Sequence, residues 1–164
     1  MTDTASSLGQ VKLGRRLEHR RVPGTELGDK VAAAARDAAL VFLASAEPEC
    51  LDSVLLVIAE LVTNAAIHGC GLVDLVMCRH VHGITVAVRD RDERVETLQF
   101  RAKQAVRSDN DMEGWSVDAV LAAIGEGGRG LLLVEKTATA WDVRRCPGGK
   151  TVRAAFAYPE AAAS

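Results

Sequence analysis

Several features that mark particular classes of protein are missing from this sequence of 164 residues. Twenty basic side chains stand against 22 acidic ones, so the chain lacks the basic excess that is typical of a nucleic-acid-binding domain. Its N-terminal region has no long apolar run, which argues against a signal peptide or a membrane anchor. We therefore expect a cytoplasmic protein that makes no direct contact with nucleic acid or membrane.

The spacing of cysteine and histidine gives little sign of a metal site. The four cysteines form no CxxC pair, and a cytosolic protein normally keeps cysteines reduced, so we interpret them as small buried hydrophobes. His80 and His82 could share one face of a strand, but no third ligand stands at a recognisable spacing. The sequence therefore favours neither a disulfide framework nor a zinc site.

Length and composition indicate one globular domain. A chain of this length can bury most of its apolar surface in one core, and its 48% of hydrophobic residues argues against intrinsic disorder. We find no internal repeat and no second domain. The predicted domain covers residues 11–158, and segments 1–10 and 159–164 are predicted to be flexible tails.

The N-terminal part of the domain predicts a strand followed by a helix. Residues 11–22 alternate loosely between apolar and charged side chains, which is typical of a strand at the edge of a sheet. Four arginines between positions 15 and 21 are either part of a solvated edge or a surface for a partner. Residues 23–25 (PGT) then end the strand, and apolar residues at helical spacing predict a helix over residues 25–45.

The most informative stretch is residues 60–69 (ELVTNAAIHG), inside a second predicted helix that spans about residues 52–68. Glu60, Asn64 and His68 recur every four residues, so they form one stripe on that helix. The apolar residues around the stripe must largely be buried. The stripe either faces water or borders this buried surface, where a carboxylate and an amide need a partner.

Two alternating stretches, residues 73–78 and 84–89, predict a pair of strands with a turn at His82 and Gly83. Asp90 has the same parity as the apolar residues of the second strand, so it points to the buried face if the strand continues. A buried carboxylate would need a hydrogen-bond donor there. If the strand ends earlier, Asp90 is solvated instead.

Residues 91–113 are heavily charged and predict a mobile loop. A short amphipathic helix over about residues 117–124 is predicted to form part of a lid. The glycine-rich segment 125–130 (GEGGRG) follows and opens an apolar helical stretch. This segment is either a simple turn or an anion site, because backbone N–H groups at a helix N-terminus favour phosphate.

The last part of the chain predicts two more strands. They start at about residues 141 and 151 and are joined by a turn at residues 147–149. Paired strands that lie between and after helices indicate an α+β fold. We expect a two-layer α/β sandwich in which helices cover one face of a mixed, mostly antiparallel sheet.

Three segments carry a resemblance to a known family. Residues 60–69 resemble the N box of the GHKL (Bergerat-fold) ATPase superfamily, and residues 128–134 (GRGLLLV) resemble its second glycine box. Residues 149–152 (GKTV) look like the closing strand of that fold. The likeness covers about residues 11–158 and is strongest to the anti-sigma-factor serine kinases and their actinobacterial relatives. It implies a Bergerat ATP-binding fold with residues 91–127 as the ATP lid.

The resemblance also implies roles for individual residues. Glu60 would be the general base for an attacking hydroxyl, and Asn64 would hold Mg²⁺ against the phosphates of ATP. Asp90 would accept a hydrogen bond from the adenine amino group, and Thr151 would lie near the base. The backbone of Gly128 and Gly130 would surround the phosphates, and Arg129 would be a charge partner for them. His68 and Leu131 would be the remaining nucleotide-binding positions.

One segment departs from the family pattern. Where the family often has Asp-x-Gly-x-Gly, this chain has Asp90-Arg91-Asp92-Glu93-Arg94. Without glycine, the backbone loses its tolerance for positive φ and for close approach to a nucleotide. Asp92 and Glu93 would also repel phosphate if they faced it.

The resemblance implies a regulatory protein that binds a sigma factor or phosphorylates a STAS-domain anti-anti-sigma partner on serine, with ATP and Mg²⁺ as cofactors. The alternative is a module that binds ATP or a protein without turnover. Glu60 and Asn64 favour a protein serine/threonine kinase, whereas the missing glycines favour the alternative, so enzyme activity stays open. A homodimer is compatible with both. The ATPase domain of a sensor kinase is a weaker expectation, because the sequence shows no phosphoacceptor-histidine helix before the domain.

Overall fold

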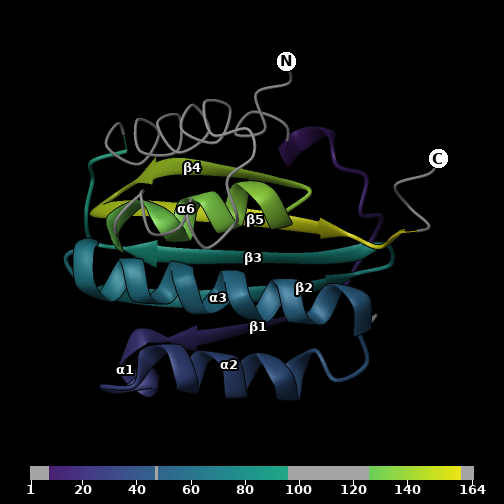
Figure 1. The fold of residues 1–164 in the computed structure, drawn as a ribbon, viewed down its shortest axis with the longest axis horizontal. Helices are drawn as coiled ribbons and strands as arrows, with labels where there is room; N and C mark the ends of the chain where they lie inside the picture. The colour runs from purple at the N-terminus through teal and green to yellow at the C-terminus, as the bar shows by residue number, and fades with distance from the viewer. Residues whose placement is uncertain (1–7, 47, 96–125, 160–164) are drawn as a thin grey trace, which may run out of the picture.

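The computed structural model describes residues 8–46, 48–95 and 126–159. In chain order its elements are the 3-10 helix η2 (Leu8–Gln10), β1 (Arg16–Pro23), α1 (Gly24–Leu27), α2 (Val31–Phe42), α3 (Pro48–His68), β2 (Leu72–His80), β3 (Gly83–Asp90), α6 (Glu126–Thr137), β4 (Ala140–Cys146) and β5 (Gly149–Ala157). Figure 1 shows a layer of helices packed on a layer of strands. The predicted α+β two-layer sandwich is thereby confirmed.

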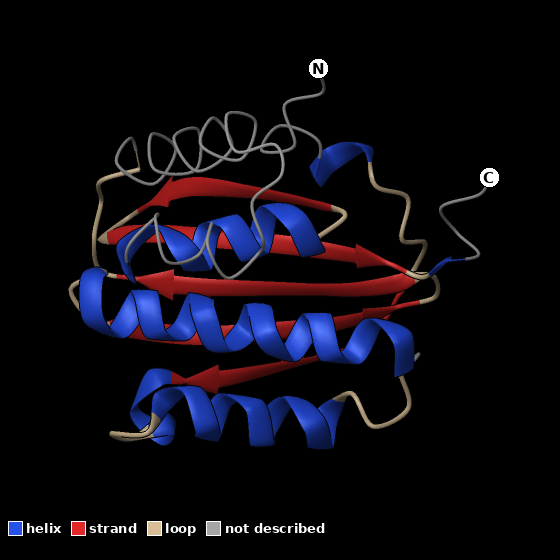
Figure 2. Cartoon of the chain, viewed as in Figure 1, coloured by secondary structure: helices blue, strands red, loops and turns tan. Residues whose placement is uncertain are grey.

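The described strands form one five-stranded sheet in the order β1-β2-β3-β5-β4. All of these pairings are antiparallel, because tight turns join β2 to β3 and β4 to β5, and β5 returns beside β3. α2, α3 and α6 lie on the same face of the sheet (Figures 1 and 2). Residues of one parity on each strand therefore meet the helices, and residues of the other parity do not.

The core lies between the sheet and the helix α3. On β3, Ile84, Val86 and Val88 are at most 2% exposed, which confirms that this parity is the buried one. They stand opposite alternate residues of β5, which bury their side chains on the same face. Asp90 continues this series on β3, so the sheet carries a carboxylate onto its covered face.

The helix α3 is the central helix of the domain. Its segment Cys50–His68 is long and apolar enough to cross a membrane by length and composition alone. In this fold, however, Val54, Val57, Ile58 and Val62 have no exposed surface, since they pack in the core. Packing therefore accounts for the hydrophobicity of this helix.

Three sequence predictions differ from the structure near the N-terminus. The predicted helix over residues 25–45 is two helices, α1 and α2, because Gly28 takes a backbone conformation with φ 59° and ψ −155° that interrupts the helical hydrogen bonding. The helix α3 starts at Pro48 rather than near residue 52, and proline is favoured at the first position of a helix. β1 begins at Arg16 rather than at residue 11.

The segment before β1 has a different role from the predicted strand. The N–H of His82 donates to the carbonyl of Leu13 at 2.9 Å, and the N–H of Val81 donates to the carbonyl of Arg15 at 3.1 Å. These bonds fix the segment to the turn between β2 and β3. The predicted lid helix, in contrast, falls outside the described residues.

Candidate functional site

Four elements meet at one end of the sheet, seen at the left of Figure 1. They are the C-terminal end of α3, the end of β3, the beginning of α6 and the beginning of β5. Segments that lie far apart in the sequence therefore bring their side chains to one place. The residues that the sequence singled out are concentrated at this end of the domain.

Glu60 and Asn64 meet at Gly130 of α6. A Cβ atom placed on Gly130 would lie 2.8 Å from Glu60 Oε2 and 2.8 Å from Asn64 Nδ2, so the absence of a side chain lets α6 pack directly over both. Both side chains are partly buried, whereas His68, one turn further along α3, is exposed. The predicted stripe is therefore divided, with two members under α6 and one in water.

Asp90 is buried and only 4% of its surface is exposed, so the solvated alternative does not hold. Its carboxylate lies against the backbone of Gly69, where a Cβ atom would come within 2.5 Å of Asp90 Oδ2. The N–H of Asp92 donates to Asp90 Oδ1 at 2.9 Å. The end of β3 thus holds a carboxylate in a closely packed environment beside the end of α3.

Lys150 is the main partner of Asp90. The two residues stand opposite each other in the pairing of β3 with β5, and Lys150 is only 3% exposed. Lys150 Nζ lies 3.1 Å from each carboxylate oxygen of Asp90. Burial raises the pKa of Asp90, and the Asp92 N–H and Lys150 lower it, with the net shift upward. Lys150 was missed in the sequence, although it shares the parity of the buried residues of β5.

Asp92 extends this group toward the surface. Lys150 Nζ lies 3.3 Å from Asp92 Oδ2 and 3.3 Å from the Asp92 carbonyl. Arg94 Nε donates to Asp92 Oδ1 at 2.8 Å, and chiefly this bond holds the pKa of Asp92 well below its usual range. The carboxylate of Asp92 is thus paired with two cations within the segment where the family often has glycine.

Comparison with known proteins supports the fold that these residues suggest. The family model for the histidine kinase-like ATPase domain matches residues 26–156, which is most of the chain. This chain belongs to that family. Its membership confirms the predicted relation to the GHKL ATPase superfamily, whereas the actinobacterial branch stays a prediction.

A structural comparison agrees with the family match. A chain in the crystal structure of the SiaB–SiaC complex from Pseudomonas aeruginosa has a similar fold, with a TM-score of 0.51 and 17% sequence identity. The similarity covers 90% of this chain and 94% of that one. No curated protein matches the sequence. At this level of identity the likeness concerns the fold alone.

The other predicted nucleotide-binding residues lie on α6 and on β5. Gly128 and Gly130 belong to the helix α6 rather than to a loop before it. Leu131 is 2% exposed and is part of the core. Thr151 lies on the sheet face opposite to Asp90, with its Oγ1 3.7 Å from Cys146 Sγ, so the structure does not bring it to the carboxylate. The side chain of Arg129 is not among those described.

The residues of the ATPase domain fit a magnesium ion that also binds phosphate. Magnesium prefers oxygen ligands and usually takes only one or two from protein when a nucleotide supplies others. Glu60 offers a carboxylate oxygen and Asn64 an amide group at the same point of α6, where the amide nitrogen faces Gly130 and rotation of the amide would present its oxygen. Among the described residues, no group of three or more His, Cys, Asp or Glu could hold a metal without such help.

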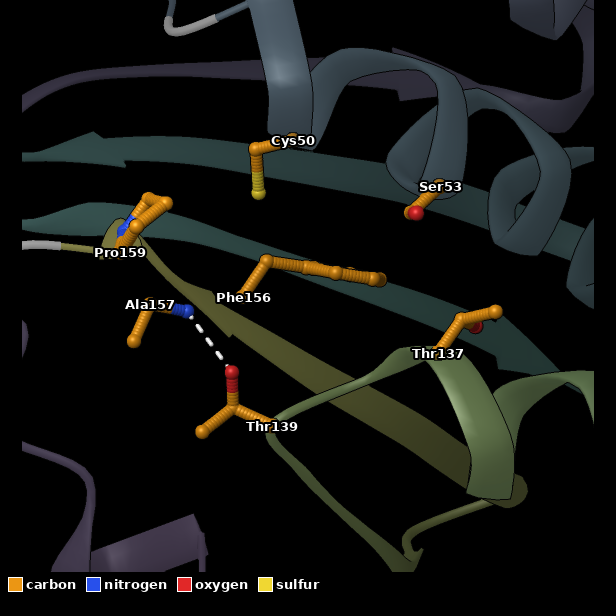
Figure 3. Close-up of a pocket in the computed structure, with 7 residues that line it drawn as sticks. All are labelled: Cys50, Ser53, Thr137, Thr139, Phe156, Ala157 and Pro159. Atoms are coloured by element: carbon orange, nitrogen blue, oxygen red, sulfur yellow. Dashed lines mark hydrogen bonds between the residues drawn. The ribbon is translucent and has the colours of Figure 1, made fainter. Parts of the chain in front are cut away.

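A separate cavity of about 240 Å³ lies at the opposite end of α3, and Figure 3 shows its lining. Cys50 and Ser53 of α3 line it from one side, and Thr139 accepts a hydrogen bond from the N–H of Ala157 on the other. Because a helix rises about 1.5 Å per residue, this cavity is roughly 20 Å along α3 from Asn64. Burial also raises the pKa of the Cys50 thiol, which makes it a poor nucleophile.

Proposed function

We propose that this protein is a cytoplasmic regulator that uses its histidine kinase-like ATPase domain to bind ATP and to act on a protein partner. The partner would be a sigma factor or a STAS-domain anti-anti-sigma protein, as the resemblance to the anti-sigma-factor serine kinases implies. The observation that carries the proposal is the meeting of Glu60 and Asn64 at Gly130, at the same end of the sheet as the buried Asp90. A carboxylate, an amide and a glycine backbone thus meet at one place.

In the kinase form of this proposal, Asn64 would hold Mg²⁺ against the phosphates, and a bound Mg²⁺ would offset their negative charge. Glu60 accepts the proton of the partner's serine hydroxyl as that oxygen bonds to the γ-phosphorus. The bond from the γ-phosphorus to the bridging oxygen breaks and ADP leaves. Glu60 suits this role because its carboxylate oxygen lies at the same point of α6 as the amide of Asn64.

A protein partner is supported by more than one observation. The SiaB–SiaC structure is a complex, so a chain of similar fold binds another protein. In the present chain, the strand β1 has exposed side chains from Arg16 to Arg21, and among the described strands it pairs with β2 on one side only. These observations justify testing purified sigma factors and STAS-domain proteins from the same genome for direct binding.

A second candidate is a binding module without turnover. It is favoured by Lys150, which already occupies the carboxylate of Asp90, and by Asp92 and Glu93, which stand where the family often has glycine. In that case the protein would bind its partner, and no phosphoryl group would be transferred. The two candidates therefore differ in a measurable product.

The deciding experiment incubates the protein with Mg-ATP and each purified STAS-domain protein, and detects phosphoserine by mass spectrometry. Glu60→Gln should abolish transfer, whereas Glu26→Gln, a matched change at an exposed glutamate of α1, should leave it intact. ATP binding itself is followed by thermal unfolding, because saturation at 100 times the Kd should stabilise the fold by about 2.7 kcal/mol.

Two results would reject the kinase form. One is retention of phosphoryl transfer by Glu60→Gln, which would remove this residue as the base. The other is absence of phosphoserine on every STAS protein that binds the wild type in the presence of Mg-ATP. Tight partner binding without phosphoserine would establish the second candidate.

A further inference from the structure

Lys150 is the strongest feature of the site that the family resemblance does not account for. A lysine that is only 3% exposed is unusual, because burying an ammonium group is unfavourable unless it is paired. Here Nζ is surrounded by oxygen atoms of Asp90 and Asp92 at 3.1–3.3 Å. The pair is fixed by the sheet register, which places Asp90 directly opposite Lys150.

The carboxylate of Asp90 has little capacity left for a ligand. Its Oδ1 accepts hydrogen bonds from Lys150 Nζ and from the N–H of Asp92, and its Oδ2 lies 3.1 Å from Lys150 Nζ. On the side of α3, Gly69 packs against the same carboxylate, since a Cβ atom on Gly69 would come within 2.5 Å of Asp90 Oδ2. Because Asp90 is only 4% exposed and Lys150 contacts both of its oxygen atoms, a nucleobase would have to displace Lys150 to take its place at this carboxylate.

We propose that Lys150 is a specificity-determining residue that takes the place of a base amino group at Asp90, so that adenine nucleotides bind only when Lys150 is displaced. The inference rests on the proposed function, since it assumes that the site accepts a nucleotide. An adenine amino group and a lysine ammonium both donate N–H to a carboxylate, and the charged donor makes the stronger bond. Lys150 therefore competes directly with the base and weakens nucleotide binding.

Asp92 supplies two hydrogen-bond acceptors that Lys150 can keep when it leaves Asp90. Its carboxylate and its carbonyl are both 3.3 Å from Nζ, so the ammonium could keep these two acceptors while it leaves Asp90. Displacement then loses the bonds to Asp90 but keeps those to Asp92, so the ammonium is not left as an unpaired buried charge. The wild type is thus expected to bind adenine nucleotides weakly rather than not at all.

The test compares Mg-ADP and Mg-IDP binding by isothermal titration calorimetry, since hypoxanthine lacks the amino group of adenine. Lys150→Thr should bind Mg-ADP about tenfold or more tighter than the wild type, because a hydrogen bond to a charged group contributes about that much. It should gain little for Mg-IDP. Lys12→Thr, at an exposed lysine, is the matched control and should behave as the wild type.

Two outcomes would overturn the proposal: unchanged or weaker Mg-ADP binding by Lys150→Thr, or an equal gain for Mg-IDP, which would indicate that the substitution merely opens space. Far-UV circular dichroism checks the fold of the variant. If Lys150→Thr is unfolded, Lys150→Met takes its place, because it removes the N–H donor and keeps most of the side-chain length. Phosphoserine formed by the wild type, together with no gain in Lys150→Thr, would refute this inference alone. A gain without phosphoserine on any STAS protein would refute only the kinase form of the proposed function.

Discussion

Replacing Lys150 with methionine removes one partner of a buried ion pair, and we expect the resulting loss of stability to depend on pH. Lys150 is 3% exposed and Asp90 is 4% exposed, so the substitution leaves a buried carboxylate whose remaining described donor is the N–H of Asp92. Removing one member of such a pair costs about 3–5 kcal/mol of unfolding free energy when the other charge stays. We expect a loss of this size where Asp90 is fully ionised in the folded variant.

The sign of the pH effect follows from the raised pKa of Asp90. Burial raises this pKa in the wild type and Lys150 lowers it, so Lys150→Met should raise it further. A carboxyl group with a raised folded-state pKa contributes stability that is fully present below its unfolded pKa of about 3.9 and is lost as the pH rises through the folded pKa. Between the folded pKa of Asp90 in the wild type and that in Lys150→Met, the deficit in unfolding free energy of the variant should therefore grow by up to about 1.4 kcal/mol per pH unit.

The assay is urea unfolding followed by far-UV circular dichroism at a pH near the unfolded pKa of about 3.9 and at about pH 8. Lys12→Met is the matched control at an exposed position and should stay within about 0.5 kcal/mol of the wild type. The double variant Asp90→Asn, Lys150→Met should recover most of the loss, because no unpaired buried charge remains. The reasoning is refuted if the deficit of Lys150→Met is the same at both pH values, or if the double variant is no more stable than the single one.

Three further predictions concern packing and accessibility. Gly149→Ala should lower the unfolding free energy by about 3 kcal/mol in thermal unfolding, because a Cβ would meet the backbone oxygen of Asp90 at 1.8 Å; a loss within the noise would contradict this contact. Gly130→Ala should change stability by less than about 1 kcal/mol, since its two closest contacts, at 2.8 Å, are the movable ends of Glu60 and Asn64, Glu60 Cβ is 3.4 Å away, and alanine favours helix, yet it should weaken Mg-ATP binding in calorimetry. Unchanged affinity would show that these side chains do not serve the nucleotide. Iodoacetamide should modify the exposed Cys70 before Cys50, whose pKa is raised by burial, and mass spectrometry that finds equal rates would disprove this order.

Much of the layer structure could be predicted from the sequence because it depends on short-range periodicity. Alternation along residues 84–89 identified the buried face of β3, and the same parity placed Asp90 on it. Spacing by four put Glu60 and Asn64 on one side of α3. Local backbone effects were harder: glycine permits the break at Gly28 without requiring it, and a proline such as Pro48 can either precede a helix or begin one.

The composition of the site was less accessible to sequence reasoning. The pattern predicted that a buried Asp90 needs a donor, but it could not say which group supplies it. The resemblance predicted Thr151 near the base; in the pairing of β3 with β5, Lys150 lies opposite Asp90 and Thr151 lies on the other face. A shift of one residue in register exchanges the two faces of a strand, so this choice belongs to the assembled sheet.

The sequence by itself determined which side chains could share a helix stripe or a strand face, because those relations involve residues two to four positions apart. Only the tertiary structure decided that Glu60 and Asn64 lie under Gly130 and that Lys150 pairs with Asp90, across a separation of 60 residues. Contacts of that range depend on how the helix layer is placed on the sheet and on the strand register. The family resemblance assigned the carboxylate of Asp90 to the adenine amino group. In the folded domain, this carboxylate forms an ion pair with Lys150 of the same chain.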